Sequence, residues 1–507
     1  MSIDYVAMAP VLAAALGALA VLVVDLVAPL RLRTTATFGT ALAGAGAALA
    51  AALAIRGEPR STFCTPPTVL PGRLEVGESC SYVVDGTTLH LLAALSAAAV
   101  AALLLAVAAA RGGGLPPGEY GFLLLSSLAG ALTLAGARDF ITLLVGLETL
   151  TLPTYALVAL RRRDPVGAEA AVKYLLVSVT STAVTLLGVA LVYGLVGSLH
   201  FDRVGVALAE RADVRALPLT SAAIVLVLAG FAFKIAAVPF HWWAPDVYQG
   251  APVPVAAYLA TVSKAGGIIG LLLVTTVAFG PSSPVWSAAL AVLAVASMTW
   301  GNLVALRQRH AVRLLAWSSV AHAGYLLVPL ASVGGRPELQ RDAVTATVGY
   351  LMLYLALTVG AFACVAAAGV TAVADFRGLA RRSPLVGGAL AVFLLGLAGL
   401  PPALAGLVAK VVVLRSALLA GAGWLAVAVA VNTVIGLAYY LRLAATAVAD
   451  RPDADRADGI AAAGGAGAAG PASRLRLAPS LAVAVGGVLV VVLVLSVAPQ
   501  LALDAAR

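Results

Sequence analysis

The sequence predicts an all-α polytopic membrane protein. Of its 507 residues, 62% are hydrophobic and only 11% are charged, and the mean hydropathy is +1.03. A soluble domain of this length would need more polar surface. Apolar stretches of 18 or more residues recur from end to end, and each is long enough to cross a bilayer as a helix. Because these stretches are uniformly apolar, without the period-two alternation of strands, we interpret them as helices.

The apolar stretches define about fourteen expected spans, with bounds placed to within several residues. They cover residues 5–27, 34–55, 87–110, 118–137, 139–160, 168–196, 217–240, 253–279, 285–306, 311–333, 343–368, 385–419, 422–446 and 479–503. The first span lacks a basic n-region and a small-residue cleavage site, so we expect a retained helix and no signal peptide.

Spans 7 and 12 are expected to contain broken helices. Residues 385–419 are too many for one straight helix, and Gly399–Pro402 interrupts their middle. The seventh span ends in Val238–Pro245, whose two prolines and two tryptophans indicate an interruption near the membrane interface. Paired broken helices predict two inverted five-helix repeats. A short similarity between Phe233–Pro239 and Leu395–Pro401 agrees with such repeats.

These features predict five consecutive regions. They are the N-terminal spans 1–3 with an external loop at 56–86 (1–117), the first inverted repeat with spans 4–8 (118–280), the second inverted repeat with spans 9–13 (281–446), a cytoplasmic linker (447–478) and the C-terminal span 14 (479–507). The linker is expected because its residues are rich in Ala, Gly and Asp.

The charged loops predict the orientation in the membrane. Most arginines fall in alternate loops, Arg161–Arg163 among them, whereas acids such as Glu58 and Asp202 accompany fewer arginines in the other loops. The positive-inside rule then places the Arg161–Arg163 loop in the cytoplasm and both termini outside. The net charge of +9 is therefore interpreted as topology control, and no nucleic-acid partner is expected.

Two of the three cysteines, Cys64 and Cys80, share the external loop. If this loop faces an oxidising compartment, they can form a disulfide. Cys364 lies in an apolar span and is interpreted as a small core residue. The sequence holds no C-x-x-C cluster, so it does not support an iron–sulfur or zinc site.

Lysine is rare, and its positions point to proton transfer. The lysines are Lys173, Lys234, Lys264 and Lys410, and they lie in or against apolar spans, as does Glu148. A charge deep in a bilayer costs at least about 2.5–3.5 kcal/mol, so such residues mark function. Arginine cannot practically lose its proton, whereas a buried lysine can. Movement of Glu148 relative to Lys234 could switch that lysine between holding and releasing a proton.

Each of these charges has a structural alternative. Lys173 follows Glu169 by four residues, so it could extend to the surface and form an ion pair. Glu148 and Lys234 could be a static buried ion pair that only orders the helix bundle. Lys264 has no evident carboxylate in its own span, and the same holds for Lys410, which makes a structural pair less available to them.

Two histidines and a polar stretch are further candidates. His322 in the tenth span could hydrogen-bond a neighbouring helix or relay protons. His241, beside two tryptophans, could be an interfacial cap or part of the path. The serines and threonines of Ser178–Thr185 could pack helices closely or line a wet path, and the sequence does not choose between these roles.

These residues, in this order, resemble the proton-pumping membrane subunits of respiratory complex I, a family shared with multisubunit cation/proton antiporters. The resemblance covers nearly the whole chain and is most specific at Trp243–Pro252. The segments that carry it are Gly146–Glu148, Glu169–Tyr174, Phe233–His241, Trp243–Pro252, Ser263–Lys264, Leu315–Tyr325 and Gly399–Pro402 followed by Lys410.

The resemblance implies a mechanism. Protons would enter from the cytoplasm through the first repeat, pass through Lys234 and Lys264, by way of His322, to Lys410, and leave at the outer face. Glu148 would tune Lys234 and couple it to the neighbouring antiporter-like subunit M. Other partners would be small membrane subunits and the lipid bilayer, in the inner (plasma) membrane of a bacterium. No cofactor is expected in this chain, because NADH, FMN, iron–sulfur clusters and quinone would be used elsewhere in the complex.

Two other functions compete with this one. The first is a subunit of a multisubunit cation/proton antiporter with the same fold, which the sequence separates poorly from a complex I subunit. The second is a structural membrane scaffold whose buried charges are inert.

Overall fold

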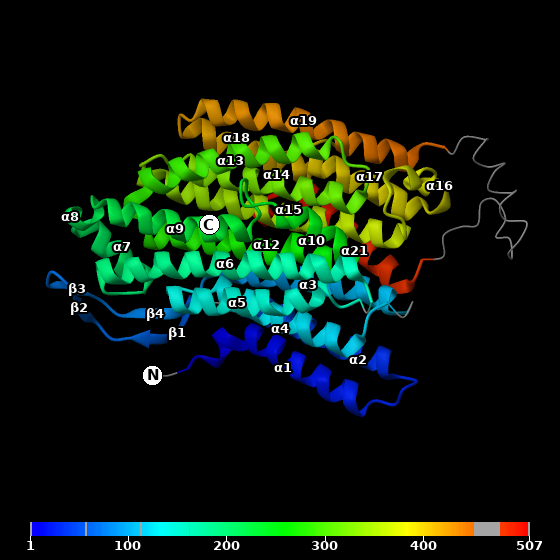
Figure 1. Cartoon of the computed structure of the whole chain (residues 1–507), viewed down its shortest axis with the longest axis horizontal. Coiled ribbons are helices and arrows are strands. Elements are labelled where there is room, and N and C mark those ends of the chain that lie inside the picture. The colour runs from blue at the N-terminus through cyan, green and yellow to red at the C-terminus, as the bar shows by residue number, and fades with distance from the viewer. Residues whose placement is uncertain (1–2, 56–57, 112–113, 162, 451–476, 505–507) are drawn as a thin grey trace, which may run out of the picture.

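The computed structural model describes residues 3–55, 58–111, 114–161, 163–450 and 477–504. Figure 1 shows long helices lying side by side with their axes roughly parallel, and two small hairpins at one end of the bundle. The all-α membrane class is confirmed. The expected linker at 447–478 falls almost entirely outside the described residues.

Twelve helices in the described part of the chain are long and apolar enough to cross a membrane. They are α1 (Tyr5–Val27), α2 (Arg33–Ala54), α3 (Gly86–Arg111), α4 (Pro117–Ala135), α5 (Phe140–Val158), α6 (Pro165–Val196), the continuous helical segment Val253–Ala278, α13 (Ser283–Ala305), α14 (Ala311–Ala331), α15 (Gln340–Ala368), α19 (Gly423–Val448) and α21 (Pro479–Val497). The expected total of fourteen spans stays a prediction.

Both expected helix breaks are present. The first separates α9 (Pro218–Lys234) from the short α10 (Trp243–Gly250), and the second separates α17 (Pro384–Ala398) from α18 (Leu404–Leu419). Prolines in both gaps lack the N–H that would continue a helix. Gly399 ends α17 with a positive φ of 85°, a conformation that suits glycine. The breaks leave helix ends inside the bundle, next to the buried lysines.

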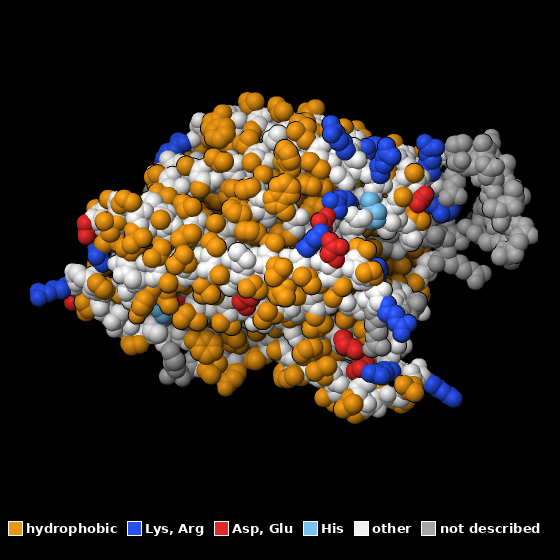
Figure 2. Space-filling model, in the orientation of Figure 1, with side chains coloured by type: hydrophobic (Ala, Val, Ile, Leu, Met, Phe, Trp, Pro, Cys, Tyr) orange, Lys and Arg blue, Asp and Glu red, His pale blue; other side chains and the backbone are white. Residues whose placement is uncertain are grey.

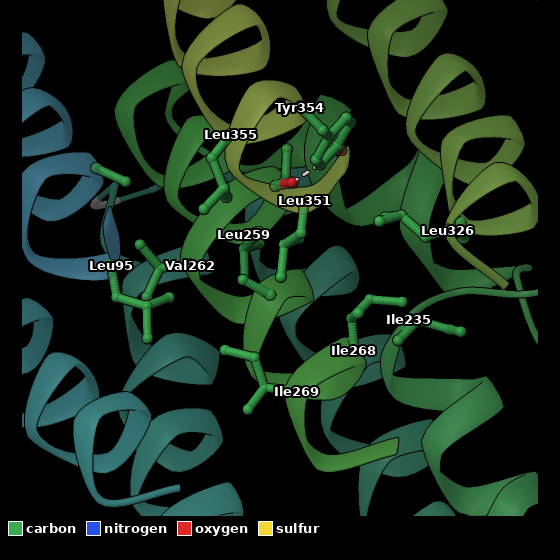
Figure 3. Close-up of a cluster of buried hydrophobic side chains, with 14 of the residues drawn as sticks. Leu95, Ile235, Leu259, Val262, Ile268, Ile269, Leu326, Leu351, Tyr354 and Leu355 are labelled. Carbon is green, nitrogen blue, oxygen red and sulfur yellow. Dashed lines mark hydrogen bonds between the residues drawn. The ribbon is translucent and has the colours of Figure 1, made fainter. Parts of the chain in front are cut away.

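The segment Val253–Ala278 lies at the centre of the bundle and is not a regular α-helix. It contains two π-helical turns, Leu259–Ser263 and Val274–Ala278, on either side of α12 (Lys264–Leu273). Figure 3 shows Leu259 of this segment among apolar side chains from other helices, such as Leu326 and Leu351. The sequence did not predict the π-helical turns, which commonly occur at functional sites.

Residues 60–84 of the loop expected at 56–86 contain four β-strands. Strand β1 (Arg60–Thr65) pairs with β4 (Ser79–Val84), and β2 (Thr68–Leu70) pairs with β3 (Leu74–Val76), both antiparallel. Cys64 and Cys80 are joined by a disulfide. The remaining described α-helices are short: α7 (Phe201–Glu210), α8 (Ala212–Arg215), α11 (Val253–Tyr258, the first part of the central segment), α16 (Leu379–Arg382) and α22 (Gln500–Leu503).

The surface agrees with a membrane environment. Figure 2 shows hydrophobic side chains over most of the visible face, while lysines and arginines gather mainly toward its two ends. Large apolar residues such as Leu16, Leu187 and Val434 are exposed on the long helices. In water such a surface would be unfavourable, whereas acyl chains or neighbouring apolar helices accommodate it.

Small residues set the distance between α1 and α2. A Cβ atom built on Gly44 would lie 3.0 Å from the Cα of Gly17 and 3.1 Å from Cδ1 of Leu125. Gly39 on the same helix has nothing within 4 Å of such an atom. Close backbone approach at small residues is a principal source of helix association in membranes.

We predict that Gly44→Val destabilises the protein and that Gly39→Val does not. The added side chain at Gly44 must separate α1 from α2, at a cost of about 1–3 kcal/mol. The measurement is the midpoint of thermal unfolding of the detergent-purified complex. Equal midpoints for the two variants would contradict the packing assigned to Gly44.

Candidate functional site: buried lysines linked by hydroxyl groups

The three lysines expected in the membrane interior are buried. The exposed fraction is 7% for Lys234, 2% for Lys264 and 5% for Lys410. Within the described ranges, none of them has a carboxylate oxygen within 4.0 Å, since the salt bridges found there involve other residues. A buried ammonium group without a counter-ion is costly, so each site must offset the charge with hydrogen bonds or remain neutral.

Lys234 and Glu148 line one small cavity but do not form a contact ion pair. Lys234 is the last residue of α9 and its Nζ donates to Oγ1 of Thr151 on α5. Glu148 lies one turn earlier on α5, and its Oε1 accepts a hydrogen bond of 2.6 Å from Oγ1 of Thr182 on α6. The cavity measures about 10 Å³, close to the space that one water molecule needs. The static ion pair considered from the sequence is therefore not formed in this structure.

Residues of the polar stretch Ser178–Thr185 both line a cavity and pack against α9, while their place in a wet path stays a prediction. Ser178 and Thr182 line the cavity of Lys234 and Glu148. Ser181 also lines it, and donates a hydrogen bond of 3.0 Å to the carbonyl of Gly230 on α9. One side of α6 thus borders the polar cavity while the adjacent side packs closely against α9.

Lys264 follows a π-helical turn directly and is bound through its ammonium group. Nζ donates a hydrogen bond of 2.5 Å to the carbonyl of Ser319 on α14. The hydroxyl of Ser319 lies 2.9 Å from that of Tyr354 on α15, and Tyr354 donates to the carbonyl of Ala260 in the π-helical turn at 2.9 Å. Figure 3 shows Tyr354 among the apolar side chains that surround this segment.

Close packing and hydroxyl groups also connect the surroundings of Lys234 and Lys264. A Cβ atom built on Gly267 would lie 2.9 Å from Cγ of Lys234, so the glycine lets this lysine pack against the helix that carries Lys264. Thr154, on the same helix as Thr151, donates to the hydroxyl of Tyr174 at 3.3 Å. The two lysines therefore belong to neighbouring polar regions.

His322 bridges two tyrosines. Its Nδ1 lies 2.8 Å from the hydroxyl of Tyr350 on α15, and its Nε2 lies 2.9 Å from the hydroxyl of Tyr440 on α19. The Tyr440 hydroxyl also contacts Oγ of Ser318, which neighbours the Ser319 that binds Lys264. Because an imidazole can donate at one nitrogen while it accepts at the other, this arrangement both joins helices and permits proton relay.

Lys410 lies at the second helix break. Its Nζ donates a hydrogen bond of 2.7 Å to the carbonyl of Ala398, the last residue of α17, and lies 5.2 Å from the ring centroid of Tyr325. The broken helix supplies this carbonyl because no continuing turn uses it. Lys410 and His322 line a common cavity of about 10 Å³, which Tyr350 and Tyr354 also border.

Lys173 lies outside this buried chain of groups. Its side chain is 48% exposed, with Nζ 2.7 Å from Glu169 and 3.4 Å from Asp246. Arg313 on α14 also contacts Asp246 at 2.7 Å. The ion pair with Glu169, considered from the sequence as an alternative to a buried role, is formed.

His241 lies in the gap between α9 and α10 and is 1% exposed. The centroid of its ring lies 4.7 Å from that of the Trp242 ring and 5.2 Å from that of the Trp317 ring. Such burial does not fit an interfacial cap, which needs contact with water.

Several polar groups of the site were not recognised in the sequence. They are Thr151, Tyr350, Tyr354 and Tyr440, all of them buried or nearly so. Each of these residues carries a hydroxyl group within an otherwise apolar span, and this pattern was the sequence signal that could have identified it as part of the site. The signal is weak because many such hydroxyls only bond their own helix, as Thr275 does.

Chemically, the arrangement is a series of groups that can exchange protons. It runs from Glu148 and Lys234 through Lys264 to His322 and Lys410, with hydroxyl groups between them. Ammonium, imidazole and hydroxyl groups can each pass a proton to a neighbour or to a bridging water. The two cavities lie where such waters would be needed.

Comparison with known proteins agrees with this arrangement. The model of the family described as NADH:quinone oxidoreductase/Mrp antiporter, transmembrane, matches residues 137–436. NADH-quinone oxidoreductase subunit N of Salinispora tropica is 46% identical over 89% of this chain and 86% of its own length. The subunit N 2 of Streptomyces griseus is 47% identical over 87% and 82%.

Solved structures give the same result. A chain of respiratory complex I from Thermus thermophilus superposes with a TM-score of 0.76 at 31% identity, covering 98% of this chain and 99% of that one. A chain of the Mrp complex from Dietzia sp. superposes with a TM-score of 0.82 at 24% identity, over 99% and 96%, which shows the shared fold alone. The chain therefore belongs to the NADH:quinone oxidoreductase/Mrp antiporter transmembrane family, among the relatives named subunit N.

Proposed function

We propose that this chain is the proton-translocating membrane subunit N of NADH-quinone oxidoreductase, in the plasma membrane of a bacterium. The observation that carries the proposal is the set of three buried lysines, which have no carboxylate oxygen within 4.0 Å among the described residues. Their ammonium groups bind hydroxyl or carbonyl oxygens, and His322 shares a cavity with Lys410. A purely structural role would favour paired charges or apolar residues, because unpaired buried charges destabilise a fold.

The proposed path crosses both repeats. Protons enter from the cytoplasm near Lys234, move laterally to Lys264, continue by way of His322 to Lys410 and leave at the outer face. The orientation, with both termini outside, follows from the positive-inside rule. The proposed repeats at 118–280 and 281–446 place one broken helix in each half, as in transporters with alternating access.

Glu148 is proposed to tune Lys234. Across a shared cavity its charge favours the protonated lysine without the geometry of a contact pair. Its hydrogen bond to Thr182 connects this charge to α6, whose apolar residues Val172, Leu176 and Leu187 are exposed. A neighbouring subunit such as subunit M that moves against this surface would change the position of Glu148 and thus the proton affinity of Lys234.

Electron transfer from NADH through FMN and iron–sulfur clusters to quinone is assigned to other subunits. Among the described residues, the group with the spacing of metal ligands is Cys64, Glu78 and Cys80. It does not fit a metal centre, because the two cysteines are joined in a disulfide and offer no thiolate.

The antiporter alternative has the same fold, as the likeness to the Mrp complex illustrates. Two observations favour the complex I assignment: identities of 46% and 47% to relatives named NADH-quinone oxidoreductase subunit N. Genes for flavin and iron–sulfur subunits beside this one would support that assignment further, and their absence would favour the antiporter.

We predict that Lys264→Ala and Lys410→Ala each abolish most proton pumping. Arginine at either position should also fail, because arginine keeps its proton. The measurement is the pH gradient formed by NADH oxidation in proteoliposomes that contain the assembled complex. Lys173→Ala is the matched control, since its side chain is exposed, and it should retain most pumping. Normal pumping in both alanine variants would support the inert scaffold instead.

We predict that Glu148→Ala lowers quinone-coupled activity and that Glu148→Asp retains part of it. The alanine variant loses the charge that acts on Lys234, whereas aspartate keeps a carboxylate in the same cavity. NADH–quinone turnover at equal complex assembly measures the effect. If Glu148→Ala and the wild type have equal activity, the proposed tuning role is wrong.

We predict that Tyr440→Phe slows proton pumping more than Tyr193→Phe does. Loss of the Tyr440 hydroxyl leaves Nε2 of His322 and Oγ of Ser318 without this partner, at a cost of about 1–3 kcal/mol. Tyr193 is 55% exposed on α6, so its hydroxyl serves as the control. Pumping that is equal in the two variants would exclude Tyr440 from the path.

A further inference from the structure

Three segments that are far apart in the sequence join in one hydrogen-bonded layer at one end of the bundle. We call this layer the outer cap: the hairpin Arg60–Val84, the loop 136–140 between α4 and α5, and residues 198–203 at the start of α7. Its backbone hydrogen bonds run from Val83 N to Gly136 O (2.8 Å), Arg138 N to Ser81 O (2.8 Å), Phe140 N to Leu199 O (3.1 Å) and Phe201 N to Arg138 O (2.9 Å). Figure 1 shows the hairpin strands at the same end of the bundle as α7.

The second repeat has a similar crossing without the hairpin. Ala311 N donates to Thr371 O (2.7 Å), and Val373 N donates to Arg309 O (2.8 Å). These two bonds have the same pattern as the two bonds between residues 138–140 and 199–201, at positions about 172 residues further along the chain. In the proposed topology, the first crossing lies at the outer face and the second at the cytoplasmic face. Only the outer crossing is extended, among the described segments, by a third partner, the disulfide-bonded hairpin.

Arg203 attaches the hairpin to α7. It is 7% exposed, and all the hydrogen bonds of its guanidinium group to described residues go to hairpin acceptors. They are Ser79 Oγ (2.8 Å), Thr65 Oγ1 (3.0 Å), Pro66 O (2.8 Å), Gly77 O (3.3 Å) and Thr65 O (3.4 Å). Asp202 accepts a further bond of 2.6 Å from Ser79. The planar guanidinium group has several donors in fixed directions, so it can bind several hairpin oxygens at once, which suits it better to this attachment than a lysine ammonium group.

An aromatic layer lies beneath these backbone bonds. Tyr82 is 1% exposed, packs directly against Gly136 and donates to the carbonyl of Leu132 at 3.3 Å. The rings of Phe140 and Phe201 pack edge to face with centroids 4.9 Å apart, and Phe279 packs 5.9 Å from Phe140. Phenylalanine rings neither accept nor donate protons, and their packing excludes water. These closely packed rings thus lie where α4 ends and where α5 and α7 begin.

We propose that the outer cap is a proton seal over the first repeat. It closes the direct route from the cavity of Lys234 and Glu148 to the outer face, so that a proton on Lys234 leaves only by lateral transfer toward Lys264. The disulfide ties β1 to β4 and keeps the hairpin seated, while Arg203 holds it on α7. This inference rests on the proposed function, because a seal matters only where protons reach Lys234.

The experiment measures passive proton leak through the reconstituted complex. A pH difference between the inside and the outside of the proteoliposomes is imposed without NADH. Its decay is followed with a pH-sensitive dye. Arg203→Gln and the pair Cys64→Ser with Cys80→Ser should each speed the decay several-fold, and reduction of the wild type with a phosphine should do the same. NADH oxidation should continue while the gradient that it forms becomes smaller. Arg73→Gln, on the exposed turn of the hairpin, is the control and should behave as wild type.

A second substitution separates a failure of the seal from a failure of the proposed function. In the seal variants, Lys234→Ala should suppress the leak, because the leaking protons pass through its cavity. A leak that persists would show a general defect and overturn the seal. The amides of Val83 and Arg138 donate the backbone bonds between the hairpin and the loop 136–140, so their hydrogen exchange shows whether the hairpin has detached. Leak at the wild-type rate with a detached hairpin also overturns the seal. Loss of pumping in Lys264→Ala with unchanged leak tests the proposed function separately.

Discussion

One constraint governs the described structure: three lysine ammonium groups are buried in an apolar bundle, and no carboxylate oxygen of the described residues lies within 4.0 Å of them. At low dielectric such a charge is expensive, and the structure offsets the cost with carbonyl and hydroxyl oxygens. Lys264 uses the carbonyl of Ser319, and Lys410 uses that of Ala398. These neutral partners hold a proton less firmly than a carboxylate would, which is what a group that must release its proton requires.

Irregular helices supply several of those oxygens. A regular helix uses its carbonyls internally, so a buried cation finds acceptors where the pattern is interrupted. The break after Ala398 frees the carbonyl that binds Lys410, and the break after Lys234 places that lysine at a helix end. The π-helical turn before Lys264 has the same character, because the carbonyl of Ala260 in it accepts from Tyr354. Helix irregularity and charge placement are therefore parts of one arrangement.

The two small cavities show how little water this conformation admits between the charged groups. Each has room for about one water molecule, one beside Glu148 and Lys234 and the other between His322 and Lys410. Transfer along the whole series therefore requires changes that wet these places in turn. The outer cap adds the complementary constraint, because a pump also needs routes that stay dry.

The sequence by itself determined the membrane class, both helix breaks and the three buried lysines, because hydropathy, proline and rare ionisable residues act locally and leave direct patterns. It also indicated the Cys64–Cys80 pair. Only the tertiary structure decided which groups meet: Glu148 bonds Thr182 instead of Lys234, and Tyr350 and Tyr440 hold His322. Such contacts join helices far apart in the chain, and their geometry depends on rotations and crossings that no local pattern encodes.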